Sequence, residues 1–161
     1  LARLTQLSRQ RPGMVAIPAS LSGIRQMHKA LKANAAVALL TDQVPPEGLG
    51  VWAPFFGKSA YTMTLAARLA LQSGAALLPV RLLRLPRGAG YEMEILPPLT
   101  GLYTTPPPDL LQAVTLVNQC IESLILSQPG HYLWAYARYK KPRGAPAATA
   151  DSSADNGKES T

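Results

Sequence analysis

Residues 41–80 read TDQVPPEGLGVWAPFFGKSAYTMTLAARLALQSGAALLPV. The apolar run just before them, 35–40, has no polar alternation, which is typical of a strand buried on both faces. It places Asp42 and Gln43 at the carboxyl end of the expected strand, before the Pro/Gly-rich loop at 45–50. Ligands bind at that end of the strands in open α/β sheets, so we expect a site here.

Strands and helices are expected to alternate on both sides of this point. Before it, Ser22 is the expected N-cap of a helix that ends near Ala33. After the loop, residues 51–56 have the character of a second strand, and a helix is expected from about Ser59 to Gln72. Such an order of elements predicts an α/β fold.

Two further apolar runs, 76–85 and 91–96, flank the turn sequence Pro-Arg-Gly-Ala-Gly and predict an antiparallel hairpin. In the second run, apolar and acidic residues alternate. This pattern predicts that Tyr91, Met93 and Ile95 face inward and that Glu92 and Glu94 face outward. Arg81 and Arg84 are the expected cross-strand partners of these glutamates.

An amphipathic helix is expected after the breaker at 106–108, and its apolar stripe comprises Leu110, Val114, Val117, Ile121 and Leu124. The complete prediction is a layered mixed sheet with flanking helices, forming a single domain over 1–141. Residues 142–161 turn to Ala, Ser, Gly and charged residues without an aromatic side chain, which predicts a disordered tail.

Composition argues against several kinds of site. With 161 residues, 47% of them hydrophobic, the chain is long enough for one core. The lone Cys120 excludes an internal disulfide, and we interpret it as a small residue at the core edge rather than a nucleophile. Two histidines give no metal-binding cluster, and glycine-rich nucleotide motifs are absent. We therefore expect neither a metal nor a cofactor.

The net charge of +7 is concentrated toward the beginning of the chain. Residues 1–34 contain no acid and six basic side chains, namely Arg3, Arg9, Arg11, Arg25, Lys29 and Lys32. The last three share one helical stripe, which suits phosphates or other anions but equally suits a solvated basic face. No apolar run reaches the ~18 uninterrupted residues of a membrane span, so none is expected within these residues.

Aromatic and basic residues interleave near the end of the chain, at Tyr132, Trp134, Tyr136, Arg138, Tyr139, Lys140 and Lys141. This pattern suits a membrane interface, for which we select Trp134, Tyr136, Arg138 and Lys140. It also superficially suits stacking on single-stranded nucleic acid. Thr62 and Thr64 are expected at the start of a helix, where free amides and hydroxyls favour an anion or a carbonyl oxygen.

Several of these motifs occur together in one known family. In order and spacing, the chain resembles the late acyltransferases of lipid A biosynthesis in Gram-negative bacteria; the motifs are Asp42-Gln43, Pro54-Phe55-Phe56-Gly57, Thr62, Thr64, Arg68-Leu69-Ala70 and Leu78-Pro79-Val80. Residues 128–144 are similar to the closing segment of that family, so the resemblance covers 22–144. Relatives commonly have His where this chain has Tyr136 and Phe where it has Tyr139.

The resemblance implies a glycerolipid-acyltransferase-like fold and transfer of an acyl chain from an acyl carrier protein thioester to a hydroxyl of a phosphorylated glycolipid, the lipid A precursor. It implies a peripheral place on the cytoplasmic face of the inner membrane, with no nucleic acid partner. The family uses His-x4-Asp/Glu, whereas His28 is followed five residues later by Ala33 and His131 by Tyr136. We therefore expect a C-terminal half, with the dyad upstream of Leu1 and no activity of the fragment alone.

The resemblance also assigns substrate contacts. It places Asp42 and Gln43 at the acceptor site, although an isolated Asp before such a loop is usually a turn former. Phe55 and Phe56 line either the core or the acyl channel, with the core favoured for one of them. Arg25 and Lys29 are candidates for the acceptor phosphates. Two alternatives stay open: acylation of another membrane lipid, such as a glycerophospholipid or mannosylated lipid, and a non-catalytic basic module for anionic lipid or nucleic acid.

Overall fold

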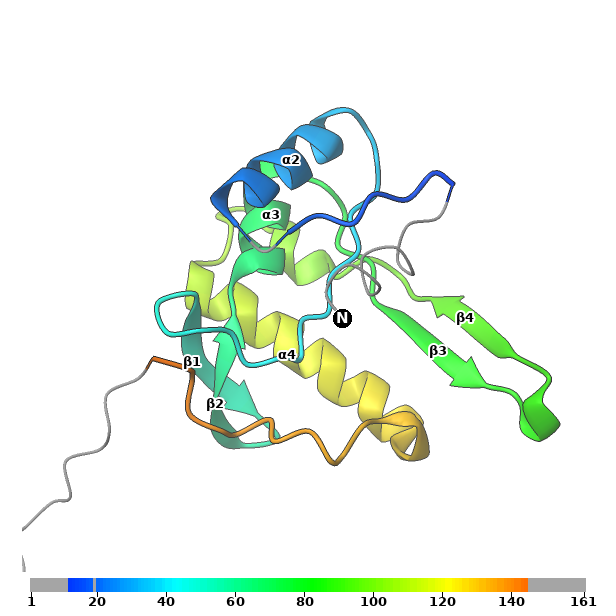
Figure 1. The fold of residues 1–161 in the computed structure, drawn as a ribbon. Helices are drawn as coiled ribbons and strands as arrows, with labels where there is room; N and C mark the ends of the chain where they lie inside the picture. Colours follow the sequence, from blue (N-terminus) through cyan, green and yellow to red (C-terminus); the bar gives the residue numbers. More distant parts are fainter. Residues whose placement is uncertain (1–11, 19, 145–161) are drawn as a thin grey trace, which may run out of the picture.

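The computed structural model describes residues 12–18 and 20–144, which Figure 1 follows from blue to orange. Its helices are α2 (Leu21–Lys32), α3 (Leu65–Ser73) and α4 (Leu110–Ser127), and its strands are β1 (Gly50–Phe55), β2 (Lys58–Met63), β3 (Val80–Arg84) and β4 (Tyr91–Ile95). Short 3-10 turns occupy Pro86–Gly88, Thr100–Tyr103 and Pro129–His131. The predicted tail beyond 144 and the basic residues Arg3, Arg9 and Arg11 lie outside the described residues.

Both helices and strands are present, as an α/β fold requires, but the strands form two separate antiparallel pairs, β1–β2 and β3–β4. The prediction of one layered mixed sheet is therefore wrong for the described residues. Its expected central strand, 35–40, forms no strand, and the Leu40 side chain there is 70% exposed. An apolar run becomes a buried strand only when neighbouring strands pair with it, and no described segment does so here.

The segment after β1 also differs from the prediction. Phe56 and Gly57 have positive φ values of 48° and 72°, a conformation that makes a tight hairpin turn. The turn returns the chain so that Val51 lies opposite Thr62. Residues 58–63 are thus a strand where a helix was predicted, because pairing with β1 outweighs their helical pattern. The helix α3 begins only at Leu65, and Gly74 closes it with φ 68°, as predicted.

The other two helices, α2 and α4, form where the sequence predicts them, although α2 begins at a different cap. α2 is capped by Ser20 rather than Ser22, since the Ser20 Oγ accepts a hydrogen bond from the Gly23 amide at 3.2 Å. α4 begins with a capping box: Asp109 Oδ1 accepts from the Gln112 amide at 2.8 Å, and Gln112 Oε1 accepts from the Asp109 amide at 2.9 Å. Both caps satisfy backbone N–H groups that have no partner inside the helix.

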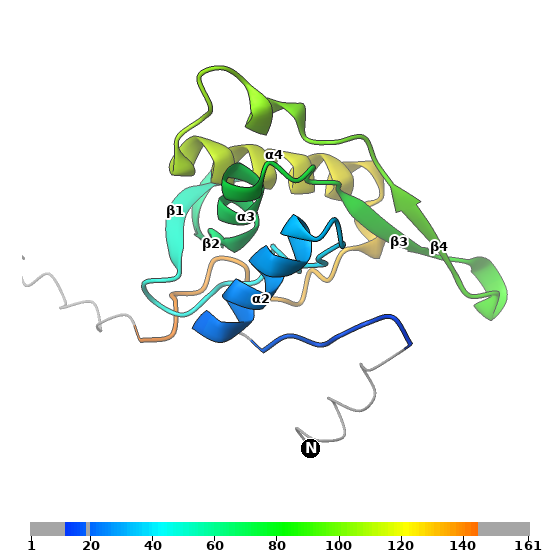
Figure 2. The same ribbon diagram turned by 90° about the horizontal axis from the view of Figure 1, so that it is seen from above.

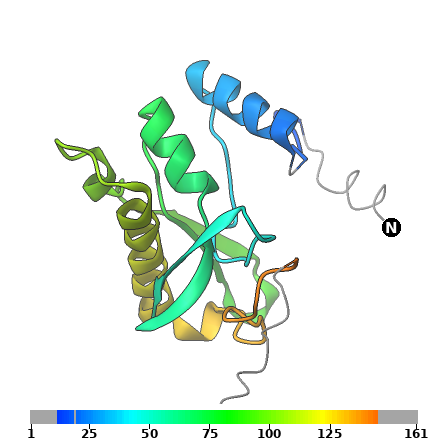
Figure 3. The same cartoon turned by 90° about the vertical axis from the view of Figure 1, so that its left-hand side faces the viewer.

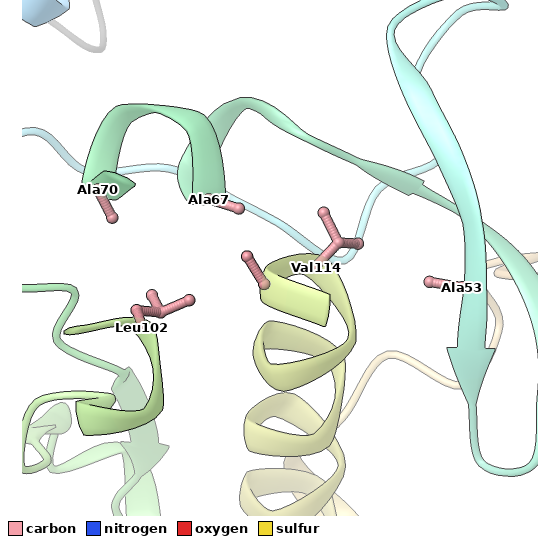
Figure 4. Packing of buried hydrophobic residues seen from close by; sticks show 6 residues of the cluster. Ala53, Ala67, Ala70, Leu102 and Val114 are labelled. Atoms are coloured by element: carbon pink, nitrogen blue, oxygen red, sulfur yellow. The ribbon is translucent and has the colours of Figure 1, made fainter. Parts of the chain in front are cut away.

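A core of small side chains joins α3, α4 and β1. Seen from the side, α2, α3 and α4 follow one another in a row, each helix packed on the next (Figure 3). Figure 4 shows the contact between them, where side chains from α3, α4, β1 and the turn at 100–103 converge; the labelled ones are Ala53, Ala67, Ala70, Leu102 and Val114. Alanines at this junction allow the backbones to approach closely.

The helix α4 is long enough and apolar enough, by its mean hydropathy, to cross a membrane. This was not predicted from the sequence, because only uninterrupted apolar runs were considered there. Polar side chains nevertheless tie this helix to the β1–β2 hairpin. Asn118 Nδ2 donates to the Pro54 carbonyl at 2.7 Å, and Glu122 Oε1 accepts from the Phe56 amide at 2.8 Å. In this structure, α4 packs against β1, α3 and the 3-10 turns at 100–103 and 129–131.

The β3–β4 hairpin was predicted with the correct pairing but the wrong orientation. Tyr91, Met93 and Ile95 are 68%, 63% and 57% exposed, so they face outward. Arg81 pairs with Glu94 at 2.6 Å as predicted, whereas Arg84 lies opposite Tyr91 and pairs with no glutamate. Figures 1 and 2 both show the hairpin extending away from the helices, so no described element covers its outer side.

Candidate functional site

Asp42 lies on the segment that connects α2 with β1, at the mouth of an open cavity. Its side chain is half-buried, whereas Gln43 beside it is exposed. The Val44 amide donates to the Tyr136 hydroxyl at 2.8 Å, which fixes this segment on the C-terminal part of the chain. The cavity, here called the Asp42 cavity, has a volume of about 250 Å³; besides Asp42 its lining includes Leu39, Leu83, Ile125, His131 and Tyr132.

Asp42 and His131 share this cavity without forming a catalytic pair. Asp42 forms no ion pair with any described residue. His131 Nδ1 accepts a hydrogen bond from the Arg84 amide at 3.3 Å, so the neutral ring carries its proton on Nε2. That arrangement leaves no free lone pair on the ring to take a proton from a substrate hydroxyl. The cavity therefore offers a carboxylate and an imidazole as hydrogen-bonding groups.

Tyr132 separates the Asp42 cavity from a second depression of about 290 Å³, because it lines both. Its hydroxyl is buried, and none of the described residues forms a hydrogen bond with it. Burial raises the pKa of Tyr132, and the negative charge of Asp42 raises it further. Both effects favour the protonated hydroxyl, which lies buried between the two depressions.

A buried polar network lies next to Tyr132 and links β2, α4 and the C-terminal segment. The Arg138 guanidinium donates to the Tyr61 carbonyl at 2.9 Å and to Thr62 Oγ1 at 2.7 Å. Thr62 Oγ1 also accepts from Asn118 Nδ2 at 3.1 Å and donates to the Ala60 carbonyl at 3.0 Å. Burial lowers the pKa of Arg138, while Tyr132 and Asp42 act in the opposite direction. Because arginine stays charged in proteins, this network surrounds a buried cation.

Two predicted contacts are corrected by this network. Arg138 is only 4% exposed, so its guanidinium does not face a membrane interface; it donates hydrogen bonds to buried oxygen atoms instead. Thr62 is fully buried in β2, and its hydroxyl already has all its hydrogen-bond partners. A substrate therefore cannot reach Thr62. Both errors come from the missed β2 strand, which contains Thr62 and supplies the oxygen atoms that Arg138 binds.

Thr64 also faces the protein. It is 7% exposed, its hydroxyl donates to the Leu49 carbonyl at 3.4 Å, and it accepts from Arg68 Nε at 3.3 Å. Thr64 does precede α3, but its side chain makes no capping bond there. The predicted anion contact at this position is therefore contradicted for the Thr64 hydroxyl.

The two phenylalanines have different environments. Phe55 is 2% exposed and packs in a cluster with Ala60 and Ile125, which confirms the core assignment for one of the pair. Phe56 is half-buried against the same cluster, and both phenylalanines line the second depression together with aromatic residues of the C-terminal segment. Tyr139 fixes that segment by donating its hydroxyl to the Phe55 carbonyl at 2.8 Å. This apolar depression is suited to an aliphatic or aromatic group.

The remaining predicted residues lie at the surface. Trp134 is 62% exposed, and Lys140 is exposed above the half-buried Tyr136 ring, with 4.7 Å between the Lys140 Nζ and the ring centroid. Arg25, Lys29 and Lys32 are exposed along α2 and line neither depression. The structure thus places the basic stripe and the Asp42 cavity on different parts of the surface.

Two other predictions concern reactive groups. Cys120 is half-buried on α4, and burial raises the pKa of its thiol, as expected for a residue at the core edge. Within residues 12–18 and 20–144, no three His, Cys, Asp or Glu side chains lie close enough together to hold a metal ion.

Sequence reasoning missed Asn118, Glu122 and Tyr132. Asn118 carried a signal, because it is a polar residue beside the apolar stripe of α4 and a buried polar group needs partners. Glu122 carried none, and Tyr132 was named only as a member of the aromatic and basic run, since their roles depend on the turn at Phe56 and on the path of the C-terminal segment.

Comparison with known proteins gives a consistent assignment. The family model described as bacterial lipid A biosynthesis acyltransferase matches residues 1–141. The lipid A biosynthesis lauroyltransferase of Escherichia coli (strain K12) is 33% identical over 126 residues, which is 76% of this chain and 40% of that protein. The lipid A biosynthesis palmitoleoyltransferase of the same organism is 33% identical over 120 residues, 74% of this chain and 38% of that protein.

A lipid A biosynthesis acyltransferase of Shigella flexneri is also 33% identical over 120 residues. The chain spans about 40% of the length of the curated relatives it matches. The family model nevertheless covers all but the last 20 of the 161 residues. The chain therefore belongs to the bacterial lipid A biosynthesis acyltransferase family.

Proposed function

We propose that a polypeptide containing this chain transfers a fatty acyl group from an acyl carrier protein thioester to a hydroxyl of a lipid A precursor. Family membership over residues 1–141 is the observation that carries the proposal. The names of the two Escherichia coli relatives, a lauroyltransferase and a palmitoleoyltransferase, support a fatty acyl group as the one transferred. We place the reaction at the cytoplasmic face of the inner membrane, with residues 1–141 as part of one acyltransferase domain.

The proposed reaction needs a base that this chain does not contain. The acceptor hydroxyl oxygen attacks the thioester carbonyl carbon, the base takes the hydroxyl proton, and the carrier sulfur leaves with the C–S bonding electrons and is then protonated. Neither His28 nor His131 has a carboxylate five residues later. We therefore assign the His-x4-Asp/Glu pair to the part of the relatives' length that these 161 residues do not span.

Within the chain, we assign acceptor positioning to Asp42 and Gln43. The half-buried Asp42 carboxylate, at the mouth of a cavity beside His131 and Tyr132, can accept a hydrogen bond from a sugar hydroxyl or amide. Arg25 and Lys29 are assigned to the acceptor phosphates, which can extend over the surface of α2. The apolar depression at Phe56 is assigned to part of the acyl chain.

The first test is an acyl-transfer assay with acyl carrier protein thioester and lipid A precursor, on the 161-residue chain and on the polypeptide extended to the relatives' full length. Turnover is expected only in the extended polypeptide. Turnover with a glycerophospholipid or mannosylated acceptor instead would redirect the assignment to another membrane lipid. Absence of transfer to any of these acceptors would support a binding module.

In the extended polypeptide, Asp42→Ala is expected to lower turnover by at least about 100-fold, because a positioned hydrogen bond to the reacting group is lost. The folded structure should persist, because this carboxylate makes no ion pair with a described residue. Glu47→Ala is the matched control, since Glu47 is an exposed acid on the same connecting segment. Wild-type turnover of Asp42→Ala would remove Asp42 from the site.

Arg25→Ala is expected to raise the KM for a phosphorylated acceptor by about tenfold, because one charge-assisted hydrogen bond is lost. The KM for the dephosphorylated analogue should stay within about twofold. Gln26→Ala, at an exposed neighbouring position of α2, is the control for nonspecific change. Equal losses with both acceptors would show that the basic stripe is a solvated face.

A further inference from the structure

The segment between α2 and β1, residues 33–49, carries Asp42 but contains no helix or strand. Its path must therefore be fixed by bonds to other parts of the chain. No hydrogen bond joins residues 36–43 to another described residue. The first long-range hydrogen bond of the segment is made by the Val44 amide, which donates to the Tyr136 hydroxyl at 2.8 Å. Figure 3 shows the two segments close together, in cyan and in orange.

The backbone that follows Asp42 is stiff. Val44 lies two positions after Asp42 and directly before Pro45 and Pro46. A proline restricts its own backbone and that of the residue before it. Pro45 is also buried, and its ring packs so closely on Gly50 that a methyl group there would lie 2.9 Å from it. The bond at Val44 therefore fixes one end of a short, stiff path that leads back to Asp42.

Tyr136 belongs to a part of the chain that is itself firmly held. Its carbonyl accepts from the Arg138 amide at 2.8 Å. The Arg138 guanidinium donates in turn to the Tyr61 carbonyl and the Thr62 hydroxyl of β2. The Tyr136 ring is half-buried, with Lys140 Nζ 4.7 Å from its centroid. The Tyr136 hydroxyl is thus an acceptor in a fixed place, and not a group on a loose surface loop.

We propose that Tyr136 is a positioning residue for the acceptor: its hydroxyl holds the Val44 amide, which keeps Asp42 at the mouth of the Asp42 cavity. Asp42 forms no ion pair with a described residue, so its backbone decides where the carboxylate lies. A displacement of about 1 Å at such a group can cost about 100-fold in rate. Tyr136 does not line the Asp42 cavity, so it acts through the segment. The inference rests on the proposed role of Asp42.

Tyr136→Phe tests the proposal in the polypeptide extended to the relatives' full length. It removes the hydroxyl and keeps the ring, so the depression that the ring lines is preserved. The kcat for transfer to the lipid A precursor is expected to fall about tenfold, because Asp42 is no longer held in one position. The KM for the acyl carrier protein thioester should stay within about twofold. A wild-type kcat would overturn the proposal.

Tyr103→Phe is the matched control. The Tyr103 hydroxyl also accepts from a backbone amide at 2.8 Å, that of Leu77, but Tyr103 lines neither depression. The two variants should lower the melting temperature similarly, because each leaves one backbone amide without its partner. Tyr103→Phe should keep kcat within about twofold of the wild type. Equal losses of kcat in both variants would show a general effect of destabilisation and overturn the proposal.

A double variant tests whether Tyr136 acts through Asp42. Asp42→Ala/Tyr136→Phe should turn over within about twofold of Asp42→Ala alone, because a carboxylate that is absent cannot be displaced. If the two losses multiply instead, Tyr136 acts on another part of the site and the positioning role is overturned. A purely structural effect of Tyr136→Phe would persist in the Asp42→Ala background.

Amide hydrogen exchange tests the same contact without turnover. The Val44 amide is expected to exchange slowly, and Tyr136→Phe should accelerate it at least about tenfold, whereas Tyr103→Phe should not. Pro45 and Pro46 have no amide hydrogen, which simplifies the assignment of the signal to Val44. Unchanged exchange at Val44 would overturn the inference and leave acyl transfer standing. A wild type that shows the expected exchange but transfers no acyl group would remove the proposed function while supporting the hold of Tyr136 on this segment.

Discussion

The molecule contains two antiparallel hairpins of similar size whose surroundings are opposite. Each strand has six residues in β1–β2 and five in β3–β4. The first hairpin packs on α4 and places Ala53, Phe55 and Ala60 in the core. The second exposes Leu82, Met93 and their neighbours to solvent. Each pair of strands therefore forms whether or not it is buried. Whether a hairpin is buried depends on which other segments of the chain pack against it.

The difference arises from partners that are distant in sequence. The β1–β2 hairpin receives hydrogen bonds or contacts from Asn118 and Glu122 of α4 and from Arg138 and Tyr139 of the C-terminal segment. The β3–β4 hairpin is held through Arg81, which donates to Ser127 at the end of α4, and through the Arg84 amide, which donates to His131. One hairpin is thus enclosed by polypeptide, whereas one face of the other is exposed among the described residues.

Truncating one side chain to alanine in each hairpin should give the largest difference in stability between them. Phe55→Ala is expected to lower the free energy of unfolding by about 3–5 kcal/mol, because it leaves a cavity in the core. Met93→Ala should change it by less than about 0.5 kcal/mol, because that side chain is exposed. Urea unfolding followed by circular dichroism measures both. A loss above about 2 kcal/mol for Met93→Ala would mean that its face is packed.

The buried cation should matter next. Arg138→Met is expected to cost about 2–3 kcal/mol, because the Tyr61 carbonyl and the Asn118 and Thr62 side chains lose a charged donor. Lys140→Met, two residues later and exposed, is the control and should stay within about 0.5 kcal/mol. The same urea titration applies. Equal midpoints for the two variants would show that the network does not stabilise the first hairpin.

The ion pair on the second hairpin should have the smallest effect. Arg81 and Glu94 have side chains that are 22% and 43% exposed, so solvent screens their attraction. Glu94→Gln is expected to cost about 0.5 kcal/mol at low salt and less in 0.5 M NaCl, estimated from exposed pairs elsewhere. Unfolding curves at the two salt concentrations measure this. A cost that does not change with salt would indicate a buried pair and a better-covered hairpin.

Local signals in the sequence predicted the elements whose causes are local. The Asp109 cap, the apolar stripe of α4, the Gly74 terminus and the pairing of the second hairpin all follow from residues within a few positions of each other. The helix predicted at 59–72 failed in its first half because Phe56 and Gly57 form a turn that brings residues 58–63 onto β1. Residues 35–40 failed because apolar composition does not itself provide a pairing strand.

The candidate site was predicted in part, for related reasons. Asp42 lines a cavity, although the strand at 35–40 that was expected to present it does not form, and its contact with the acceptor stays a prediction. Thr62, Thr64 and Arg138 point into the protein, because each depends on the β2 strand that the sequence pattern disguised as a helix. Alternation in β4 separated its two faces correctly, but it could not tell which face the chain covers.

The path of the C-terminal segment also constrains the order of folding. Tyr136, Arg138 and Tyr139 reach partners 92, 76 and 84 residues earlier in the chain. The first hairpin can form as soon as residue 63 has left the ribosome, but the Thr62 hydroxyl receives its charged donor only after residue 138 has been made. Contacts of such long range form slowly, since a long loop must close first. A nascent chain therefore carries an incompletely bonded hairpin while residues 64–138 are being made, and the arrival of Arg138 completes its hydrogen bonds.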